Sequence, residues 1–373
     1  MRQAFRAGAA LVAVALLAAG CAKPSSSSNG TGAGAPAKFT GCMVTDTGGI
    51  NDKSFNQSSW AGMQAAAATN PNITVKYLPS TSTADYAKNI SAFEAQKCGV
   101  IVTVGFAMGP ATQSAALADP SQKFAIVDCS YASFCLSTSA HPKIAHNITQ
   151  LVYNTVQDAF LGGYLAAGMT KTGKVATFGG MKFGTVTIYE DGFWDGVQYY
   201  NKQHHTHVQV LGWSEPSQNG TFVGAGPTAF TDVAAGVTIA NTFITHGADI
   251  IFPVAGGVGL GTAKAVQTAN QAGKHVAMFW VDTDGCLSEP TYCPYFITTV
   301  EKGLSASVKA SVLLAAKGAQ GGSYVGTLQN GGAVLGPYHD WASKVPASLQ
   351  SELNTLKQDI ISGKIVPATK SPV

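Results

Sequence analysis

The sequence predicts an α/β protein whose parallel sheets form two similar lobes. Short β-branched runs alternate with longer amphipathic runs from Phe39 onward, and strict alternation of this kind is typical of α/β folds. The strand-like runs are nearly continuously apolar, as expected where helices cover both faces of a sheet. The series also runs twice, with a first set of units that ends near Thr149 and a second set over 173–281.

Each expected strand is a short, mostly β-branched apolar run. The expected strands are Cys42–Thr45, Ile73–Leu78, Val100–Val104, Phe124–Val127, Lys174–Phe178, Val208–Gly212, Ile250–Val254, Val276–Val281 and Phe296–Val300. Each expected helix is a longer amphipathic run. The expected helices are Ser54–Ala68, Ala84–Gln96, Ala111–Ala118, Thr155–Met169, Ile188–Lys202, Ala229–Thr245, Thr262–Ala272, Leu304–Ala316 and Ser348–Ser362.

The composition has few charged residues, as in a membrane protein, but the sequence contains no apolar run long enough for a membrane-spanning helix. The chain has 373 residues, of which 46% are hydrophobic and 12% are charged, whereas soluble domains usually carry about 25% charged residues. The only long run that is free of charge and mostly apolar is 7–22, and its 16 residues fall short of the ~20 that a spanning helix needs. A net charge of +3 gives little reason to expect nucleic acid or an anionic membrane as a partner.

The first 38 residues are predicted to be an export signal and a tether. Arg2 and Arg6 precede an apolar stretch that ends in small residues just before Cys21, as in a signal peptide over 1–20. A cysteine at this point resembles a bacterial lipobox and predicts lipidation of Cys21; the alternative is an ordinary secretory signal. Residues 21–38 are rich in Pro, Ser, Gly and Ala and predict a flexible tether. The globular part is therefore expected outside the cell membrane, held at its outer face by lipid.

Export makes disulfides possible for the six remaining cysteines. They are Cys42, Cys98, Cys129, Cys135, Cys286 and Cys293. Six cysteines allow fifteen connectivities, of which spacing favours two short loops, Cys129 with Cys135 and Cys286 with Cys293, and leaves Cys42 and Cys98. The alternative is that these residues are buried, reduced thiols.

The strand-end loops are where a ligand is expected, because ligands of doubly wound sheets bind outside the carboxyl ends of the strands. In the first loop a strand ends at Asp46, paired glycines turn the chain, and a helix opens with Phe55 and Asn56. An apolar ring beside polar amides can stack a planar ligand and hydrogen-bond its edge. The alternative places Phe55 in the core and makes Asn56 a helix-start residue.

Several motifs in collinear order resemble one known family. The first is Asp46–Gln57 followed by Trp60-Ala61-Gly62, and the others are Val104-Gly105-Phe106, Phe124–Asp128, Phe178–Lys182, Gly192–Gly196, Pro253–Gly259, Val281–Asp284 and Thr298–Lys302. Together they resemble the signatures of the basic membrane protein family, the purine-nucleoside-receptor type of bacterial lipoprotein. The resemblance implies a type I periplasmic-binding-protein fold, with two lobes joined by a hinge, and a receptor that serves the permease of an ABC importer.

The resemblance also implies a role for individual residues. It places Phe55 and Phe193 on the two faces of a nucleoside base, Asn56 and Asp128 at the base edge, Asp282 and Lys302 on the ribose hydroxyls, and the backbone of Gly256 and Gly257 near the sugar. Asp46 and Phe106 complete the predicted ligand-binding set. Stacking on an aromatic side chain contributes roughly 1–3 kcal/mol per base, so two rings would supply a large share of the affinity. No cofactor, metal ion or nucleic-acid partner is expected, and the receptor is expected to be a monomer.

The same resemblance predicts the division into lobes. The N-terminal lobe is expected over 39–152 plus about 283–312, and the C-terminal lobe over 153–282 plus about 313–373. In such a lobe the first and third strands are parallel neighbours, and Cys42 and Cys98 both lie near their amino ends, within plausible bridging distance.

Other motifs have simpler interpretations. Gly168–Lys174 has the spacing of a phosphate loop but precedes a strand, where the motif requires a strand first and a helix after it, so a helix end is preferred. The glycines at 257, 259 and 261 do not match the dinucleotide spacing. His204, His205 and His207 cluster at a predicted helix end, where a solvated turn is preferred to a metal site. A sugar receptor of the same fold and, less favoured, a nucleoside hydrolase remain alternatives, although no catalytic motif is present.

Overall fold

The computed structural model describes residues 38–133, 135, 144–226, 228–371 and 373. Residues 38–373 form one compact unit. The predicted signal peptide, Cys21 and the tether up to residue 37 lie outside the described residues. No helix in the described part of the chain is long and apolar enough to cross a membrane.

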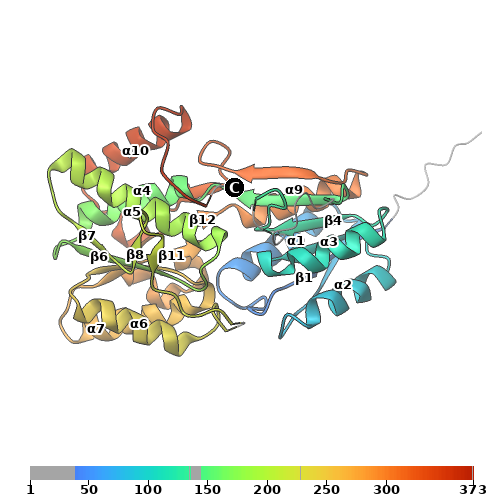
Figure 1. Ribbon diagram of the computed structural model, residues 1–373, viewed down its shortest axis with the longest axis horizontal. Helices are drawn as coiled ribbons and strands as arrows, with labels where there is room; N and C mark the ends of the chain where they lie inside the picture. The colour runs from blue at the N-terminus through green and yellow to red at the C-terminus, as the bar shows by residue number, and fades with distance from the viewer. Residues whose placement is uncertain (1–37, 134, 136–143, 227, 372) are drawn as a thin grey trace, which may run out of the picture. The chain divides into compact units, whose positions relative to one another are not determined.

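Two six-stranded sheets organise the fold (Figure 1). The first sheet has the order β13-β5-β4-β3-β1-β2 and is parallel throughout. Its strands are β1 (Phe39–Val44), β2 (Ile73–Leu78), β3 (Val100–Val104), β4 (Phe124–Val127), β5 (Ile148–Tyr153) and β13 (Gly322–Gly326). The helices of this lobe are α1 (Phe55–Thr69), α2 (Asp85–Ala95), α3 (Gly109–Ala118) and α9 (Leu304–Ala316), with the short 3₁₀ helix η1 (Phe106–Met108).

The second sheet has the order β14-β12-β11-β10-β6-β7 and is parallel except at β14. Its strands are β6 (Lys174–Gly179), β7 (Gln209–Leu211), β10 (Ile250–Val254), β11 (Ala277–Asp282), β12 (Phe296–Lys302) and β14 (Ala333–Leu335). A two-stranded ribbon joins β8 (Trp213–Ser214) to β9 (Asn219–Gly220). The helices are α4 (Val156–Met169), α5 (Gly184–His204), α6 (Val233–Thr245), α7 (Gly259–Gln271), α8 (Gly285–Ser288) and α10 (Ala347–Ile361), with the 3₁₀ turns η2 (Gly256–Val258), η3 (Pro290–Tyr295) and η4 (His339–Trp341).

The second sheet is covered on both faces, which explains its continuously apolar strands. Successive side chains of a strand point to opposite faces, so Phe279 packs into the core under α4, α5 and α10, whereas Trp280 packs into the core under α6 and α7. Figure 1 shows these two groups of helices on opposite sides of the sheet. The predicted α/β architecture with parallel sheets is confirmed.

The division into lobes differs from the prediction at two strands. β12 pairs with β11 in the second sheet, although 283–312 was expected in the N-terminal lobe. β13 pairs with β5 in the first sheet, although 313–373 was expected in the C-terminal lobe. The chain therefore crosses between the sheets three times, after β5, β12 and β13. The physical reason is strand pairing, because β12 is hydrogen-bonded in parallel to β11. The strand β13 is short and begins and ends with glycine, so its sequence alone does not indicate that β5 is its partner.

Three disulfides join the six cysteines in the pairs that the sequence favoured. Their Cα–Cα distances are 6.0 Å for Cys42–Cys98, 5.5 Å for Cys129–Cys135 and 4.6 Å for Cys286–Cys293, all within the usual range for a disulfide. Cys42 is the fourth residue of β1, and Cys98 precedes β3, the parallel neighbour of β1, by two residues. This bridge therefore ties the interior of β1 to the segment that leads into β3.

Phe193 belongs to the core of the second lobe, which corrects its predicted place against a ligand. Its side chain is 0% exposed, and its ring centroid lies 5.4 Å from that of Phe252 and 6.2 Å from that of Phe279. The glycines that flank it explain the motif in another way. A Cβ on Gly192 would meet the carbonyl oxygen of Val156 at 2.5 Å, and one on Gly196 would meet that of Phe160 at 2.0 Å. The motif therefore brings α5 into close contact with α4.

This packing predicts a stability loss for Phe193→Ala. Removing a fully buried phenylalanine ring leaves a cavity and costs about 3–5 kcal/mol, so we expect the free energy of unfolding to fall by that amount in urea titrations followed by circular dichroism. Phe55→Ala is the matched control, because Phe55 is only half-buried and should cost much less. Equal, small losses for the two variants would contradict the core assignment.

A candidate ligand-binding site between the lobes

One cavity collects side chains from the carboxyl ends of strands in both sheets. Its lining includes every predicted ligand-binding residue except Phe193. These nine are Asp46, Phe55, Asn56, Phe106, Asp128, Gly256, Gly257, Asp282 and Lys302. The segments that follow β1, β3 and β4, including the first turn of α1, supply the first five. The turn after β10 and the ends of β11 and β12 supply the rest. The arrangement follows the rule that doubly wound sheets place ligands beyond their strand ends.

The loop between β1 and α1 is held by two carboxylates. Asp52 accepts hydrogen bonds from the backbone N–H groups of Ser54 (3.1 Å), Asn56 (2.7 Å) and Gln57 (3.0 Å). It therefore satisfies N–H groups that the start of a helix leaves without intrahelical partners. Asp46 accepts from Gly48 N (3.0 Å) and from Asn56 Nδ2 (2.7 Å). These bonds fix the shape of the loop and the position of its side chains.

Lys302 forms the charged centre of the site and links the two lobes. Its Nζ donates to Asp128 Oδ2 at 2.5 Å and lies 3.6 Å from Asp282 Oδ1. Asp282 also accepts from Tyr189 Oη (3.1 Å) and from Ser54 Oγ (3.0 Å). Asp128 and Ser54 belong to the first lobe and the other three residues to the second, so hydrogen bonds and an ion pair cross between the lobes at this point.

Burial shifts the proton affinity of these groups. Desolvation raises the pKa of Asp46 to about 6, against hydrogen bonds from Asn56 and Gly48 that lower it. Desolvation also raises the pKa of Asp128 to about 6, although the charge of Lys302 opposes it. Burial alone would lower the pKa of Lys302, but the carboxylates of Asp128 and Asp282 outweigh that effect and the net shift is upward. The two carboxylates therefore favour the charged form of Lys302, and the pKa values of Asp46 and Asp128 lie well above the ordinary range of an aspartate.

Aromatic rings form the apolar part of the wall. The Phe55 ring lies 5.3 Å from Lys302 Nζ, and the Tyr189 ring lies 5.1 Å from the same atom. Phe106, on the first lobe, stacks on Phe183 of the second lobe with ring centroids 3.8 Å apart. Phe230 also lines the cavity. Aromatic side chains from both lobes thus surround the polar centre.

Sequence reasoning missed several residues that line the cavity. They are Asp52, Thr185, Tyr189 and Phe230, together with Gly48, Gly105, Val186, Val254 and Val281. Asp52 and Gly48 were inside the recognised loop motif, where an assignment was possible. Tyr189 lies one helical turn before Phe193 on α5, so an aromatic residue was expected from the correct helix but at the wrong turn. Phe230 lies in a loop between β9 and α6 with no local signal.

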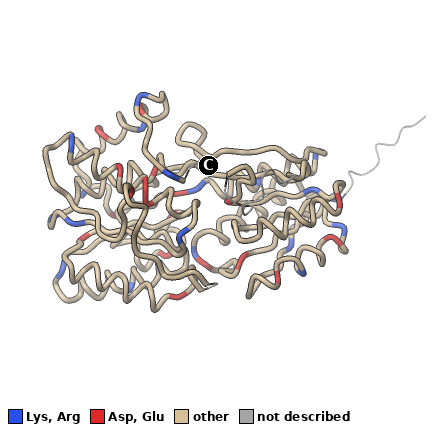
Figure 2. Tube along the Cα trace, viewed as in Figure 1, with Lys and Arg blue, Asp and Glu red and all other residues tan. Residues whose placement is uncertain are grey.

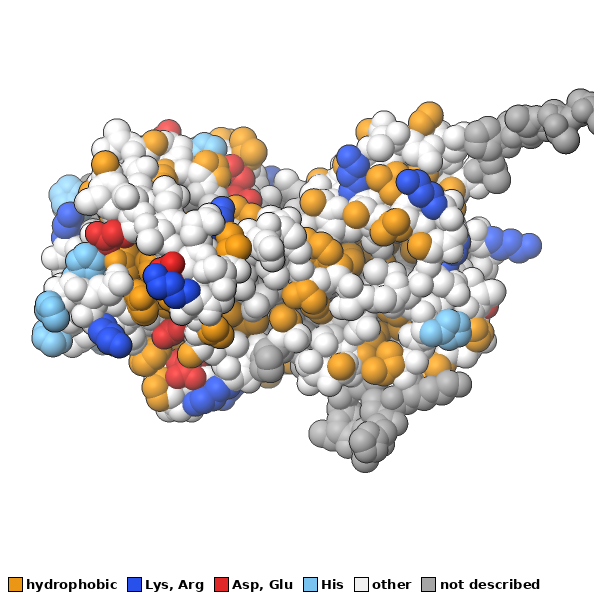
Figure 3. Space-filling view, turned by 90° about the horizontal axis from the view of Figure 1, so that it is seen from above, with side chains coloured by type: hydrophobic (Ala, Val, Ile, Leu, Met, Phe, Trp, Pro, Cys, Tyr) orange, Lys and Arg blue, Asp and Glu red, His pale blue; other side chains and the backbone are white. Residues whose placement is uncertain are grey.

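The alternative motifs have structural explanations. Gly173, in the run with phosphate-loop spacing, has a φ of +72° and turns the chain between α4 and β6. The glycine run at 257–261 spans the end of η2 and the start of α7, where a Cβ on Gly259 would meet the Trp280 ring at 3.0 Å. His204, His205 and His207 lie at the end of α5, and His204 Nε2 is 3.0 Å from Glu352 Oε2. Figure 3 shows histidine side chains at the outer end of the second lobe.

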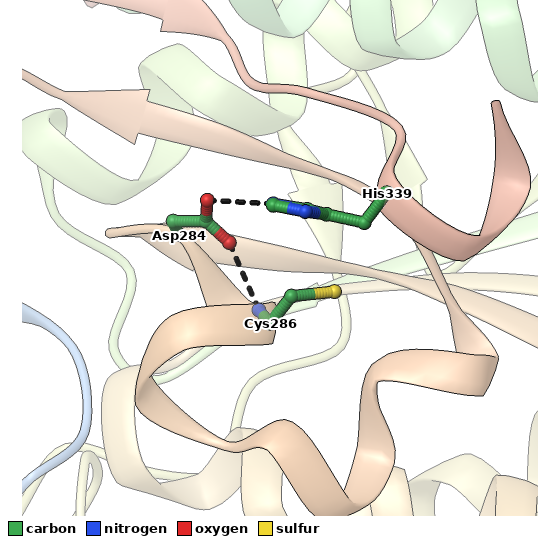
Figure 4. A group of neighbouring side chains, drawn as sticks. All are labelled: Asp284, Cys286 and His339. Atoms are coloured by element: carbon green, nitrogen blue, oxygen red, sulfur yellow. Dashed lines mark hydrogen bonds and ion pairs between the residues drawn. The ribbon is translucent and has the colours of Figure 1, made fainter.

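Among the described residues, one group has side chains close enough to suggest a metal site. It consists of Asp284, Cys286 and His339 (Figure 4). Cys286 is bonded to Cys293, so its sulfur is not a thiolate ligand. Asp284 caps α8 by accepting from Cys286 N at 2.9 Å, and its other oxygen lies 2.7 Å from His339 Nε2. Helix capping and the hydrogen bond between Asp284 and His339 account for the group.

Comparison with known proteins places these features in a family. Residues 39–369 match the family model described as "ABC transporter substrate-binding protein PnrA-like". The chain is 29% identical over 375 residues to the "ABC transporter nucleoside-binding protein BmpA" of Lactococcus lactis, and the alignment covers 97% of both chains. It is 26% identical to "Basic membrane protein A" of Borreliella afzelii, over 87% of this chain and 90% of that one.

The fold has relatives among solved structures. An ABC transporter solute-binding protein from Aeropyrum pernix superposes with a TM-score of 0.76 at 22% identity, over 88% of this chain and 94% of that one. The type I periplasmic-binding-protein fold is confirmed. With a family model that spans nearly all of the described residues and two sheets that meet at one cavity, the chain belongs to the PnrA-like, or basic membrane protein, family of ABC transporter substrate-binding proteins.

Proposed function

We propose that this protein captures a nucleoside, with a purine nucleoside preferred, between its two lobes and delivers it to the permease of an ABC importer. The observation that carries the proposal is the composition of the cavity wall, where aromatic rings and buried hydrogen-bonding groups from both lobes converge. The name of the L. lactis relative, a nucleoside-binding protein, supports the same ligand class.

The parts of a nucleoside correspond to parts of the site. Phe55 offers a face on which a base can stack, and Asn56 and Asp128 offer polar atoms to its edge. Asp282 Oδ1 lies 3.6 Å from Lys302 Nζ. Together these two groups can bind a ribose diol, since a carboxylate forms strong charge-assisted hydrogen bonds with hydroxyl donors. Because Phe193 is in the core, the second aromatic contact comes from Tyr189, Phe106 or Phe230 in this proposal.

The proposed cycle is capture and release without bond-making. Ligand would enter with the lobes apart, and closure would form the contacts that cross between them, such as Lys302 with Asp128 and Ser54 with Asp282. Closure of this kind is a hinge motion, and the three chain crossings are the segments that would bend.

Titration of the protein from Phe39 onward with adenosine, inosine, uridine and simple sugars tests the ligand class. We expect calorimetric binding of purine nucleosides, no release of free base, and an affinity loss of roughly 5- to 150-fold in Phe55→Ala from lost stacking of about 1–3 kcal/mol. Binding of sugars alone would contradict the base contact. Appearance of free base would show an enzyme.

The shifted carboxyl groups predict that affinity depends on pH. A ligand that donates hydrogen bonds to Asp46 and Asp128 binds their ionised forms better. Since their pKa values are raised to about 6, affinity should be full near pH 8 and weaken progressively as the pH falls through 6 to 5. Dissociation constants measured across that range check this. Phe55→Ala should show lower affinity but the same pH profile, and a flat profile in the wild type would contradict the use of ionised carboxylates.

We also propose that Cys21 carries a lipid that ties the exported protein to the outer face of the cell membrane. The support is the signal-like segment before Cys21 and the small, polar residues after it. In cell fractionation, Cys21→Ser should move the protein from the membrane to the soluble fraction. A variant with Ser25 changed to Ala, in the tether, is the matched control and should stay with the membrane. Retention of Cys21→Ser in the membrane would contradict lipid anchoring.

A further inference from the structure

The side-chain amide of Asn56 has one polar atom for which the described residues supply no hydrogen-bond partner. The side chain is 1% exposed and lines the cavity. Its Nδ2 donates to Asp46 Oδ1 (2.7 Å) and to Asp52 Oδ2 (3.0 Å). Its Oδ1 is buried and accepts no hydrogen bond from any described residue. A buried acceptor without a hydrogen bond is unfavourable, so a donor from a bound ligand would satisfy it.

The two carboxylates decide which way the amide faces. An asparagine amide can be rotated to exchange its oxygen and nitrogen, and only its hydrogen-bond partners distinguish the two orientations. An ionised carboxylate only accepts. In the rotated amide, the Asn56 oxygen would stand against oxygens of both Asp46 and Asp52, at distances where hydrogen bonds now form. Both amide hydrogens are therefore committed, and Oδ1 is the atom left for the ligand.

Asp52 is itself held in place, so it can act as a positioning residue. Its carboxylate accepts the three backbone N–H groups at the start of α1, which leaves it little freedom to turn away from Asn56. Asp52 is buried, at 9% exposure. The hydrogen bonds from these N–H groups thus also fix the position of Asp52 Oδ2, which accepts from Asn56 Nδ2.

We propose that Asp46 and Asp52 lock the Asn56 amide with its oxygen toward the ligand, and that the site thereby selects nucleosides whose base presents an N–H donor. The inference rests on the proposed nucleoside function and goes beyond it by naming the chemical feature that is selected. The surrounding side chains agree, because Asp46 and Asp128, the other polar side chains of the first lobe that were predicted to contact ligand, are acceptors when ionised.

A set of three ligands tests the selection. Adenosine and inosine carry an N–H donor on the edge of the base, and purine riboside carries none. In calorimetry, the wild type should bind adenosine or inosine, whichever binds more tightly, with at least tenfold higher affinity than purine riboside. The affinity ratio is this donor-bearing nucleoside over purine riboside. In Asp52→Asn the new side-chain amide can donate to Asn56 Oδ1 and allow the Asn56 amide to rotate. In this variant we expect the affinity ratio to fall to about threefold or less, mainly because the affinity for adenosine or inosine decreases.

Asp232→Asn is the matched control. Asp232 caps α6 by accepting a hydrogen bond from Ala235 N at 2.9 Å, and it does not line the cavity. The affinity ratio of Asp232→Asn should therefore equal that of the wild type. Asparagine is a good helix-capping residue, and both variants should fold. If Asp52→Asn does not, Asp46→Asn removes the other acceptor of the amide and makes the same prediction.

The outcomes separate this inference from the function on which it rests. If the wild type binds purine riboside as tightly as adenosine and inosine, the donor selection is wrong and the nucleoside function stands. If Asp52→Asn weakens all three ligands equally, Asp52 only supports the loop and the lock is wrong. If no nucleoside binds to the wild type, the proposed function fails and the selection of nucleosides fails with it.

Discussion

A single buried ammonium group joins the two lobes at the candidate site. Lys302 comes from the second sheet and is paired with a carboxylate from each lobe, Asp128 and Asp282. A buried charge is strongly unfavourable unless it is paired and hydrogen-bonded, so the position of Lys302 constrains everything around it. Both carboxylates must arrive at the same point, and the strand ends that carry them must be brought together. The other contacts between the lobes at this site, such as Ser54 with Asp282 and Phe106 with Phe183, lie around Lys302 and its two carboxylates.

The backbone shows how the carboxylates reach that point. Asp128 follows β4 directly and has a φ of 59°, and Asp282 ends β11 with a φ of 68°. Residues other than glycine rarely adopt this left-handed region, although aspartate is among those that tolerate it best. The same local turn therefore occurs once in each lobe, at the end of a strand, and in both cases it directs a carboxylate to Lys302. Such conformations persist only where the surroundings hold them and are concentrated at functional sites.

Charge elsewhere on the molecule follows no comparable pattern. Basic and acidic residues are scattered along the chain in both lobes (Figure 2). The low content of charged residues, which at first suggested a membrane protein, agrees with two sheets whose strands are largely buried.

Local features of the site could be predicted from the sequence, and features that depend on packing could not. The loop from Asp46 to Asn56 is contiguous, so its turn, helix start and ring could be recognised together. Phe193 was misplaced because neighbouring turns of α5 offer two aromatic residues, and only the close approach of α4 at Gly192 and Gly196 determines that Tyr189 reaches the cavity. Phe230 reaches it from a distant loop. The strands β12 and β13 were assigned to the wrong lobes because pairing partners across a sheet are not encoded within the strands themselves.

The interleaving of the two sheets has a consequence for synthesis of the chain. β13, one of the two edge strands of the first sheet, is made only after β6, β7, β10, β11 and β12 of the second. The helix α9, which packs on α1, is also made after those strands. A nascent chain that stops before residue 304 therefore lacks a helix and an edge strand of the lobe that began at its amino end. The first lobe is therefore completed only after most of the second has been made, and the second is completed last, by β14 and α10. Neither lobe corresponds to one continuous segment of the chain.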